Sequence, residues 1–141
     1  MSVKQISVFL ENRPGALCEL TGVLAENAID MRAFSLAEAS DFGIARIIVD
    51  DVYKTTTVLR DKGFVHSVTP VLAAALSDTP GGLNEILQCL SAEGINVEYM
   101  YAFLGNTPGK AYMVFRVNDP AAGTAALCRH GIEPLEELNV E

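Results

Sequence analysis

Apolar and polar positions alternate at the start of the chain and then change to the spacing of a helix. Residues 5–10 follow a period of two, which predicts a strand with one buried face. Leu17, Leu20 and Leu24 follow at the three- and four-residue intervals of an amphipathic helix. Pro14 suits the first helical position, because a fixed φ and a missing N–H are tolerated there. We therefore expect the helix to begin at Pro14.

The next residues complete a small α/β module. Two β-rich runs, residues 29–39 and 44–50, flank a Gly-containing turn and predict a hairpin. Either Asp of the pair at residues 50–51 can cap a second helix, which Gly63 then ends in a left-handed conformation. Residues 64–69 predict a short last strand. The order β-α-β-β-α-β is the ferredoxin-like arrangement, so the fold class is α+β, with an antiparallel four-stranded sheet and two helices on one face.

The same pattern occurs a second time along the chain. Pro80 follows Pro14 by 66 residues, and Gly131 follows Gly63 by 68. The second copy is therefore two residues longer than the first. We place this insertion in the hairpin turn, because turns accept insertions more readily than strands. The second copy predicts a strand at 71–77, a helix from Pro80, strands near 95–104 and 110–117, a helix from Pro120 and a last strand near 132–138.

The joint between the copies is short, which bears on how they behave. Residues 1–69 and 70–141 make two domains, with only Pro70 between two extended runs and no Gly- or Ser-rich linker. We expect the two modules to pack together and to behave as one unit.

The sheet face without helices is partly apolar. Phe9 and Val3 on the first strand, and Tyr99 and Tyr101 in the second copy, place apolar groups there. Because an exposed apolar face marks an interface and open strand edges are usually covered, we expect the copies to pair into a larger sheet. The same reasoning predicts a homodimer or a higher homo-oligomer.

Composition and charge narrow the possible partners. The chain has 141 residues, of which 50% are hydrophobic, so a packed core is expected. Its net charge of −8 disfavours binding to nucleic-acid phosphates or to an anionic membrane surface. No apolar run reaches the roughly 18 residues of a membrane span, and the first residues do not form a signal peptide.

Cysteine and histidine usage gives no pattern of a metal site or an active site. Cys18, Cys89 and Cys128 are an odd number of widely spaced residues, which predicts free, mostly buried thiols in a reducing cytoplasm. His66 and His130 are the only histidines, and their spacing from the cysteines does not resemble a zinc site. We find no nucleophile elbow and no phosphate-binding glycine loop, so we predict no catalytic residue, no metal and no cofactor.

The strongest local signal for binding is the segment 11–17, between the first strand and the first helix. The N–H groups at the start of a helix lack partners within it, and together with the helix dipole they attract an anion such as a carboxylate. Gly15 has no Cβ and allows a ligand to approach the backbone, while Asn12 can both donate and accept hydrogen bonds. The alternative interpretation is that Asn12 and Gly15 only shape a tight turn.

These motifs resemble the ACT domain, a regulatory module of amino-acid metabolism, once in each copy. The residues that carry the resemblance are Asn12-Arg13-Pro14-Gly15-Ala16-Leu17 with Ala28-Ile29-Asp30-Met31, and Asp78-Thr79-Pro80-Gly81-Gly82-Leu83 with Gly94-Ile95-Asn96-Val97. The first stretch is similar to the serine-binding ACT domains of phosphoglycerate dehydrogenases.

The resemblance implies a non-catalytic regulatory module that binds a free amino acid where ACT domains pair side by side. In serine-binding members, an Asn in the first loop and an Asn at the start of the second strand contact the ligand. A His that such members carry two residues before the loop Asn is replaced here by Leu10 and Leu76, which leaves room for an apolar side chain. The predicted ligand-binding residues are Leu10, Asn12, Arg13, Pro14, Gly15, Ala16, Leu17, Asp30, Asp78, Thr79, Gly81, Gly82, Leu83 and Asn96.

Other functions on this fold remain as alternatives. Acylphosphatases share the βαββαβ order and hold phosphate with an Arg in the first loop, where Arg13 stands, but their surrounding glycine-rich cradle is missing. RNA-recognition domains need aromatic and basic central strands, and residues 44–49 and 111–117 do not match. A ligand-free interaction module would use the same Pro-Gly turn. The expected partners of a regulatory module are a free amino acid as small-molecule ligand, a second copy of the chain and a metabolic enzyme.

Overall fold

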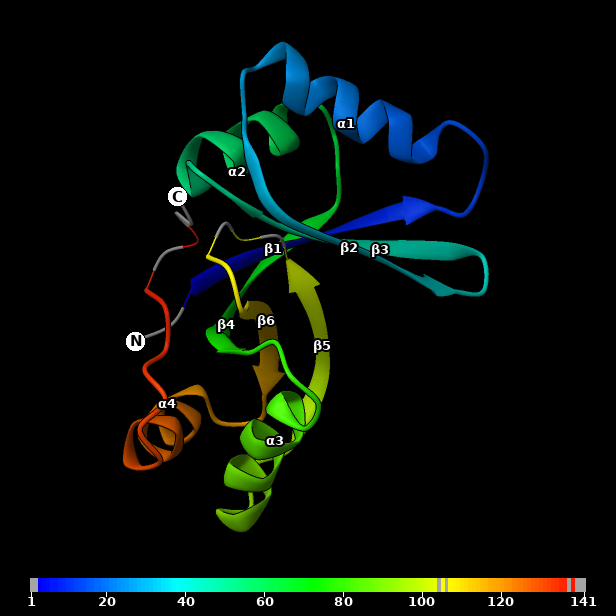
Figure 1. The fold of residues 1–141 in the computed structure, drawn as a ribbon. Coiled ribbons are helices and arrows are strands. Elements are labelled where there is room, and N and C mark those ends of the chain that lie inside the picture. Colours follow the sequence, from blue (N-terminus) through cyan, green and yellow to red (C-terminus); the bar gives the residue numbers. More distant parts are fainter. Residues whose placement is uncertain (1–2, 104, 106, 137, 139–141) are drawn as a thin grey trace. The chain divides into compact units, whose positions relative to one another are not determined.

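The computed structural model describes residues 3–103, 105, 107–136 and 138. Its chain divides into two compact units, one of Lys4–Thr69 and one of Pro70–Glu141 together with Met1–Val3. Helices and antiparallel strands make up both units (Figure 1). The predicted α+β fold class, with two ferredoxin-like modules in tandem, is confirmed.

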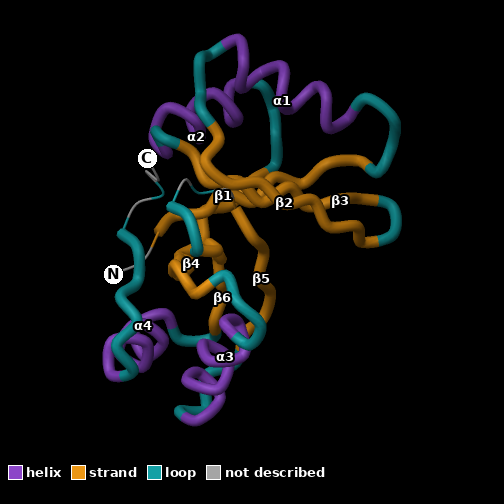
Figure 2. Tube along the Cα trace, in the orientation of Figure 1, coloured by secondary structure: helices purple, strands orange, loops and turns teal. Residues whose placement is uncertain are grey.

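The first unit contains the complete βαββαβ order. Its strands follow the order β2-β3-β1-β4, and both β1 and β2 pair with β3 in antiparallel register. Figure 2 shows its helices on the same side of the strands. The elements are β1 (Val3–Glu11), α1 (Ala16–Glu26), β2 (Met31–Ala39), β3 (Phe42–Val49), α2 (Val52–Asp61) and β4 (His66–Ser77).

The second unit uses the later part of β4 as its first strand. Its strands follow the order β4-β6-β5, and β6 pairs with both neighbours in antiparallel register. Its further elements are α3 (Gly82–Ala92), β5 (Val97–Phe103), β6 (Lys110–Val117) and α4 (Pro120–Arg129).

The segment around Pro70 differs from the prediction. We expected separate strands at 64–69 and 71–77, but the structure has the single strand β4 through Pro70. A proline is tolerated in a strand where the ladder does not need its N–H. The carbonyl of Pro70 remains available and accepts a hydrogen bond from Nη1 of Arg116 at 2.9 Å.

The predicted last strand near 132–138 is also wrong as a strand. Pro134 makes only an isolated antiparallel bridge to Ala74, and the N–H of Leu135 donates to the carbonyl of Ala73 at 2.7 Å. Because Pro134 has no N–H, it cannot continue an antiparallel ladder. Residue 137 lies outside the described part of the chain.

Two helices begin later than their prolines suggest. Gly15 and Gly81 are the residues that precede α1 and α3, with left-handed φ values of 86° and 90°. Pro14 and Pro80 therefore lie outside the helices, which corrects the expected helix starts. A left-handed residue reverses the chain sharply between turn and helix, and glycine adopts this conformation without strain. Pro120, in contrast, is the first residue of α4, as expected.

The predicted start and end signals of α2 are confirmed, and α4 has equivalent ones. The Asp51 carboxylate accepts the Lys54 N–H at 3.0 Å and caps α2, and Asp119 caps α4 in the same way. Gly63 and Gly131 follow these helices with φ values of 79° and 75°. None of the helices in the described residues is long and apolar enough to cross a membrane.

The strand register places the insertion between the copies at the predicted position. Ala37 pairs with Ile44 in the first hairpin, and Phe103 pairs with Tyr112 in the second. These pairs correspond to each other through shifts of 66 and 68 residues. The two additional residues therefore lie in the hairpin end of the second copy, beyond the shared pairs.

Each unit has its own hydrophobic core on the helix-covered side of its strands. Side chains that alternate along the central strands meet one face of each helix, as the periodicity predicted. The fully or nearly buried members in the first unit are Ile6, Val8, Leu10, Leu20, Leu24, Ala45, Ile47 and Leu59, and those in the second are Leu72, Ala74, Ile86, Leu90, Phe115, Val117 and Leu127.

The helix-free face of the first unit carries exposed aromatic rings. Phe9 is 41% exposed and Phe42 is 43% exposed, with ring centroids 6.3 Å apart. Phe9 thus lies as expected, whereas Val3 is buried and does not contribute to an exposed patch.

The cysteines differ from the expected burial. All three thiols are free, but only Cys89 is buried, while Cys18 and Cys128 are exposed. Cys18 and Cys128 lie on the outer sides of amphipathic helices, where a thiol is not needed for packing.

Candidate functional site

The two strand-to-helix turns have the same backbone geometry, which is the basis of the candidate site. In each turn, the N–H of the first helical residue donates to a carbonyl three residues back, and the left-handed glycine accepts the first intrahelical bond. The bonds are Ala16 to Arg13 (3.3 Å) and Glu19 to Gly15 (2.9 Å), and Gly82 to Thr79 (3.0 Å) and Glu85 to Gly81 (3.1 Å). The next N–H groups of each helix have no intrahelical partner and can receive an anion.

Each turn is tied to the hairpin of its own unit. The N–H of Asn12 donates to the carbonyl of Asp41 at 3.0 Å, and the N–H of Asp78 donates to Gly109 at the same distance. The side-chain Nδ2 of Asn12 also donates to the carbonyl of Ser40 at 3.1 Å. The Asn12 side-chain NH2 group therefore holds the hairpin turn, while its amide oxygen takes no part in that hydrogen bond and can accept one from a ligand.

Asp30 and Asn96 lie at the far end of their sheets from these turns. The N–H of Asp30 donates to the Asp50 carboxylate at 3.2 Å, at the end of β2 opposite to Ser40. The nine residues of β2 span roughly 30 Å at about 3.3 Å per residue. The structure therefore does not bring Asn12 and Asp30 of one unit together.

The Asp30 carboxylate and the Asn96 backbone also have partners. Arg32 lies 2.9 Å from the Asp30 carboxylate, and the Asn96 N–H donates to the side chain of Asn118 at 3.0 Å. Asn96 lines a hollow of about 410 Å³ at the end of α3, away from the Gly81 turn.

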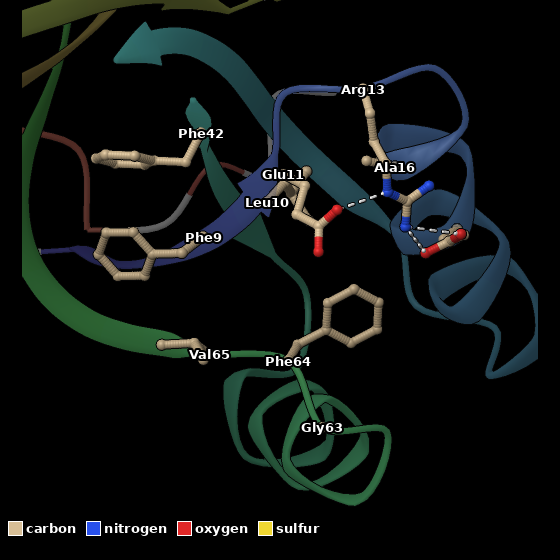
Figure 3. A pocket seen from close by; sticks show the side chains of 10 residues that line it. Phe9, Leu10, Glu11, Arg13, Ala16, Phe42, Gly63, Phe64 and Val65 are labelled. Atoms are coloured by element: carbon tan, nitrogen blue, oxygen red, sulfur yellow. Dashed lines mark hydrogen bonds and ion pairs between the residues drawn. The ribbon is translucent and has the colours of Figure 1, made fainter. Parts of the chain in front are cut away.

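The first unit has a hollow of about 400 Å³ beside its turn (Figure 3). Phe64 directs its ring toward the Arg13 side of this hollow, whereas Phe9 and Phe42 point the other way. The segment that carries Phe64 lies beside β1, where the Phe9 N–H donates to the Val65 carbonyl at 2.9 Å. The lining residues are Phe9, Leu10, Glu11, Arg13, Ala16, Glu19, Phe42, Gly63, Phe64 and Val65.

Arg13 is engaged in ion pairs at the mouth of this hollow. Its Nε lies 2.9 Å from the Glu11 carboxylate, and its Nη2 lies 3.2 Å from the Glu19 carboxylate. The hydrogen bonds that Arg13 donates, first to Glu11 and then to Glu19, raise the pKa of its guanidinium above the usual value. Two carboxylates thus neutralise the residue that an acylphosphatase-like site would need for phosphate.

The second unit has a hollow of about 500 Å³ beside its own turn. Among the described residues, Asp78 is the only charged one that lines it, and Thr79 stands where the first copy has Arg13. The Thr79 hydroxyl lies 2.8 Å from the Ser77 hydroxyl, a hydrogen-bond distance. The lining residues are Leu76, Ser77, Asp78, Thr79, Gly81, Leu83, Asn84, Leu87, Ala111 and Met113.

The remaining predicted site residues have packing or backbone roles. Leu10 and Ala16 are buried core residues that also line the first hollow, and Leu17 packs against the same core. The Pro14 carbonyl accepts a hydrogen bond from Nη1 of Arg13 at 3.4 Å. A Cβ on Gly82 would lie 2.1 Å from the Ser77 carbonyl oxygen, so the close approach of the strand end requires glycine there.

Both hollows contain residues that the sequence did not single out. Phe64 and Val65 reach the first hollow from the segment after α2, and Met113 reaches the second from β6. Leu87 could have been found, because it follows Leu83 by one helical turn. Met113 carries no local signal, because strand pairing alone brings it beside α3.

Comparisons with known proteins agree with this architecture. The family model described as an ACT domain pair matches residues 1–140. Protein BT0572 from Bacteroides thetaiotaomicron is 38% identical, with a TM-score of 0.89 over 96% of this chain and 92% of that chain. A search of curated proteins gives no significant match.

More distant solved structures show the same fold. The ligand-free regulatory subunit of aspartate kinase from Thermus thermophilus is 15% identical, with a TM-score of 0.66 over 91% of each chain. The corresponding subunit from Thermus flavus is 17% identical, with a TM-score of 0.62 over 92% of this chain and 90% of that chain. With a family match over nearly its whole length, this chain belongs to the ACT domain family, as a pair of ACT domains in one polypeptide.

Proposed function

We propose that this ACT domain pair is a non-catalytic regulator that binds a free amino acid through its two Pro-Gly turns. The observation that carries the proposal is the recurrence of one turn geometry, a left-handed glycine before a helix, in both copies. A hollow adjoins each turn, although Gly81 lines the second hollow and Gly15 does not line the first. Solved structures with this fold include regulatory subunits of aspartate kinase. The family and these neighbours support a role in the control of amino-acid metabolism, with an enzyme as a further partner.

The second hollow has the better polarity for an amino acid. The first N–H groups of α3 suit the ligand carboxylate, and the Asp78 carboxylate suits its ammonium group. Leu76, Leu83 and Met113 provide an apolar wall, which favours an apolar side chain over serine. In the first copy the Arg13 ion pairs occupy the mouth of the hollow, so we expect weaker binding there.

Self-association would complete the site. β2 and β5 lie at outer edges of their units' sheets, where only one neighbour pairs with each. An uncovered edge is a template for another strand, so pairing with a second chain is the expected way to cover it. Asn12 and Asp30 are far apart in one unit, and only side-by-side pairing of domains could bring such residues to one ligand. The free thiols also fit action in the cytoplasm.

A thermal-shift screen of the twenty amino acids tests the proposal. A ligand present at about 100 times its Kd stabilises the folded state by roughly 2.7 kcal/mol, a shift of several degrees for a chain of this size. Calorimetric titration of the best ligand should then show that Asp78→Asn weakens binding about ten- to a hundredfold, because a charged hydrogen bond is lost. Asp61→Asn makes the same charge change at the exposed end of α2 and should leave binding unchanged.

The alternative is a ligand-free interaction module, which the exposed Phe9 and Phe42 pair favours. In that case none of the amino acids shifts the melting temperature, while light scattering still gives a dimer or a larger assembly. A monomer mass at micromolar concentration would contradict self-association in either case.

A further inference from the structure

Three potential metal ligands meet in the second unit at the ends of its two helices. Cys89 and Glu93 lie one helical turn apart on α3, where Glu93 is the C-cap residue, and His130 is the C-cap residue of α4. The thiol sulfur, a carboxylate oxygen and an imidazole nitrogen of this cluster all lie within 4.8 Å of one another. We name these residues the Cys-Glu-His cluster.

Backbone hydrogen bonds hold the cluster in place. The Cys89 thiol donates to the Ala126 carbonyl of α4 at 3.3 Å, and the His130 N–H donates to Ala126 and Leu127 at 3.3 and 3.1 Å. The Glu93 N–H donates to the Leu90 carbonyl at 3.2 Å. The α-carbon positions of the three ligands are therefore set by the packing of α3 against α4, without help from a cation.

The distance between the imidazole and the carboxylate suits a small divalent cation. Around tetrahedral Zn²⁺, with ligands at about 2.0–2.3 Å, neighbouring ligand atoms lie roughly 3.3–3.8 Å apart. His130 Nε2 and the Glu93 carboxylate lie 3.6 Å apart, within this range. Cys89 is only 3% exposed, so the sulfur forms the inner wall of the site, while the partly exposed Glu93 and His130 leave an open side toward solvent.

The repeat shows that the fold does not require these residues. The first copy has Val23, Asn27 and Lys62 at the corresponding positions, and this set has no thiol, imidazole or carboxylate. The Asn27 side chain there donates to the Val23 carbonyl at 2.8 Å, which completes the helix end without a cation. A set of three ligands of the types that zinc prefers thus occurs in one copy alone.

Arg129 is the competing group. Its guanidinium forms an ion pair and hydrogen bonds with the Glu93 carboxylate, and these raise the pKa of Arg129 above its usual value. The side chain of Arg129 is 60% exposed, so it can turn into solvent when a cation takes the carboxylate. Removing Arg129 should therefore favour cation binding.

We propose that Cys89, Glu93 and His130 bind Zn²⁺ or a similar borderline divalent cation, with water at the fourth position, in the second copy only. The sequence spacing gave no sign of a zinc site, because His130 lies 37 residues after Glu93 and reaches it only through helix packing. A bound cation would link the end of α3 to the end of α4. The opposite end of α3 lines the 500 Å³ hollow.

Titration of the reduced, chelator-treated full-length protein with Co²⁺ tests the site. We expect a thiolate-to-cobalt charge-transfer band and tetrahedral d–d bands at one equivalent, both removed by Zn²⁺. Removing a residue that only positions a metal ligand weakens metal binding about 10–100-fold. Cys89→Val removes a ligand itself and introduces the residue found in the first copy, so it should weaken binding at least as much and abolish the charge-transfer band. Cys128→Ser removes an exposed thiol on α4 and should leave the titration unchanged.

Two further variants keep the proposal testable if Cys89→Val does not fold. His130→Lys, again the first copy's residue, should weaken Co²⁺ binding while the protein keeps its circular dichroism spectrum. Arg129→Ala should strengthen binding, an effect that a purely structural ion-pair cluster would not produce. The proposal is overturned if the parent shows no charge-transfer band, if the band survives Cys89→Val, or if Arg129→Ala and His130→Lys both leave the affinity unchanged.

Discussion

Gly82→Ala tests whether the close approach of α3 to the end of β4 requires glycine, because the steric cost of a Cβ and the higher helix propensity of alanine change stability in opposite directions. An added Cβ would lie 2.1 Å from the Ser77 carbonyl oxygen and 3.1 Å from the Ser77 carbonyl carbon. Both are backbone atoms at the end of β4, so relief requires the strand end or the helix start to move by about 1 Å. Overpacking of this kind costs about 1–3 kcal/mol, while the higher helix propensity of alanine returns at most about 1 kcal/mol. The expected net effect is destabilisation by about 1–2 kcal/mol.

Gly22→Ala is the matched control in the first unit. Gly22 lies inside α1, and nothing stands within 4 Å of its added Cβ, so propensity acts alone and should stabilise by up to about 1 kcal/mol. Urea unfolding measures both changes as shifts of the midpoint at constant m-value. If Gly82→Ala raises the midpoint as Gly22→Ala does, the close approach between α3 and the Ser77 carbonyl is refuted.

Further predictions follow from the caps, the turns and the thiols. Gly15→Leu should lower the free energy of unfolding measured with urea by about 1–2 kcal/mol, because an L-residue is strained at a φ of 86°, and Gly15→Asn should lower it less. Asp119→Ala should cost about 1 kcal/mol of stability through loss of the α4 cap, measured in the same way; no change would argue against that cap. A thiol reagent should modify Cys18 and Cys128 in the folded protein and Cys89 only after unfolding, and rapid labelling of all three would contradict the described burial. Burial raises the pKa of the Cys89 thiol. The stability that the buried neutral thiol contributes is therefore present at neutral pH and is lost as the pH rises through that raised pKa. Urea unfolding of the parent and of Cys89→Val at neutral and alkaline pH would measure this loss.

The sequence by itself determined the repeat, the order of most elements, both ends of α2 and the start of α4. Asp51 caps α2 and Gly63 ends it because both signals act over a few residues and need no distant partner. The alternation along residues 5–10 and the helical spacing of Leu20 and Leu24 likewise predicted side chains of the first core, since burial of one face follows from periodicity. The change of the repeat spacing from 66 to 68 residues located the insertion in the hairpin turn, because turns accept additional residues more readily than strands.

Tertiary structure alone decided the features that depend on distant contacts. Pro14 and Pro80 carried the signature of a first helical residue, but the left-handed Gly15 and Gly81 moved the helix starts beyond them. Pro134 reaches β4 as a single bridge, because a residue without an N–H cannot extend a ladder.

The candidate sites also depend on contacts between residues that are distant in the sequence. Met113 enters the second hollow through strand pairing, and Cys89 meets Glu93 and His130 through the packing of two helices. Such neighbours are set by how elements pack and not by spacing along the chain. Local patterns therefore gave the elements and the turns, whereas the hollows and the Cys-Glu-His cluster required the assembled fold.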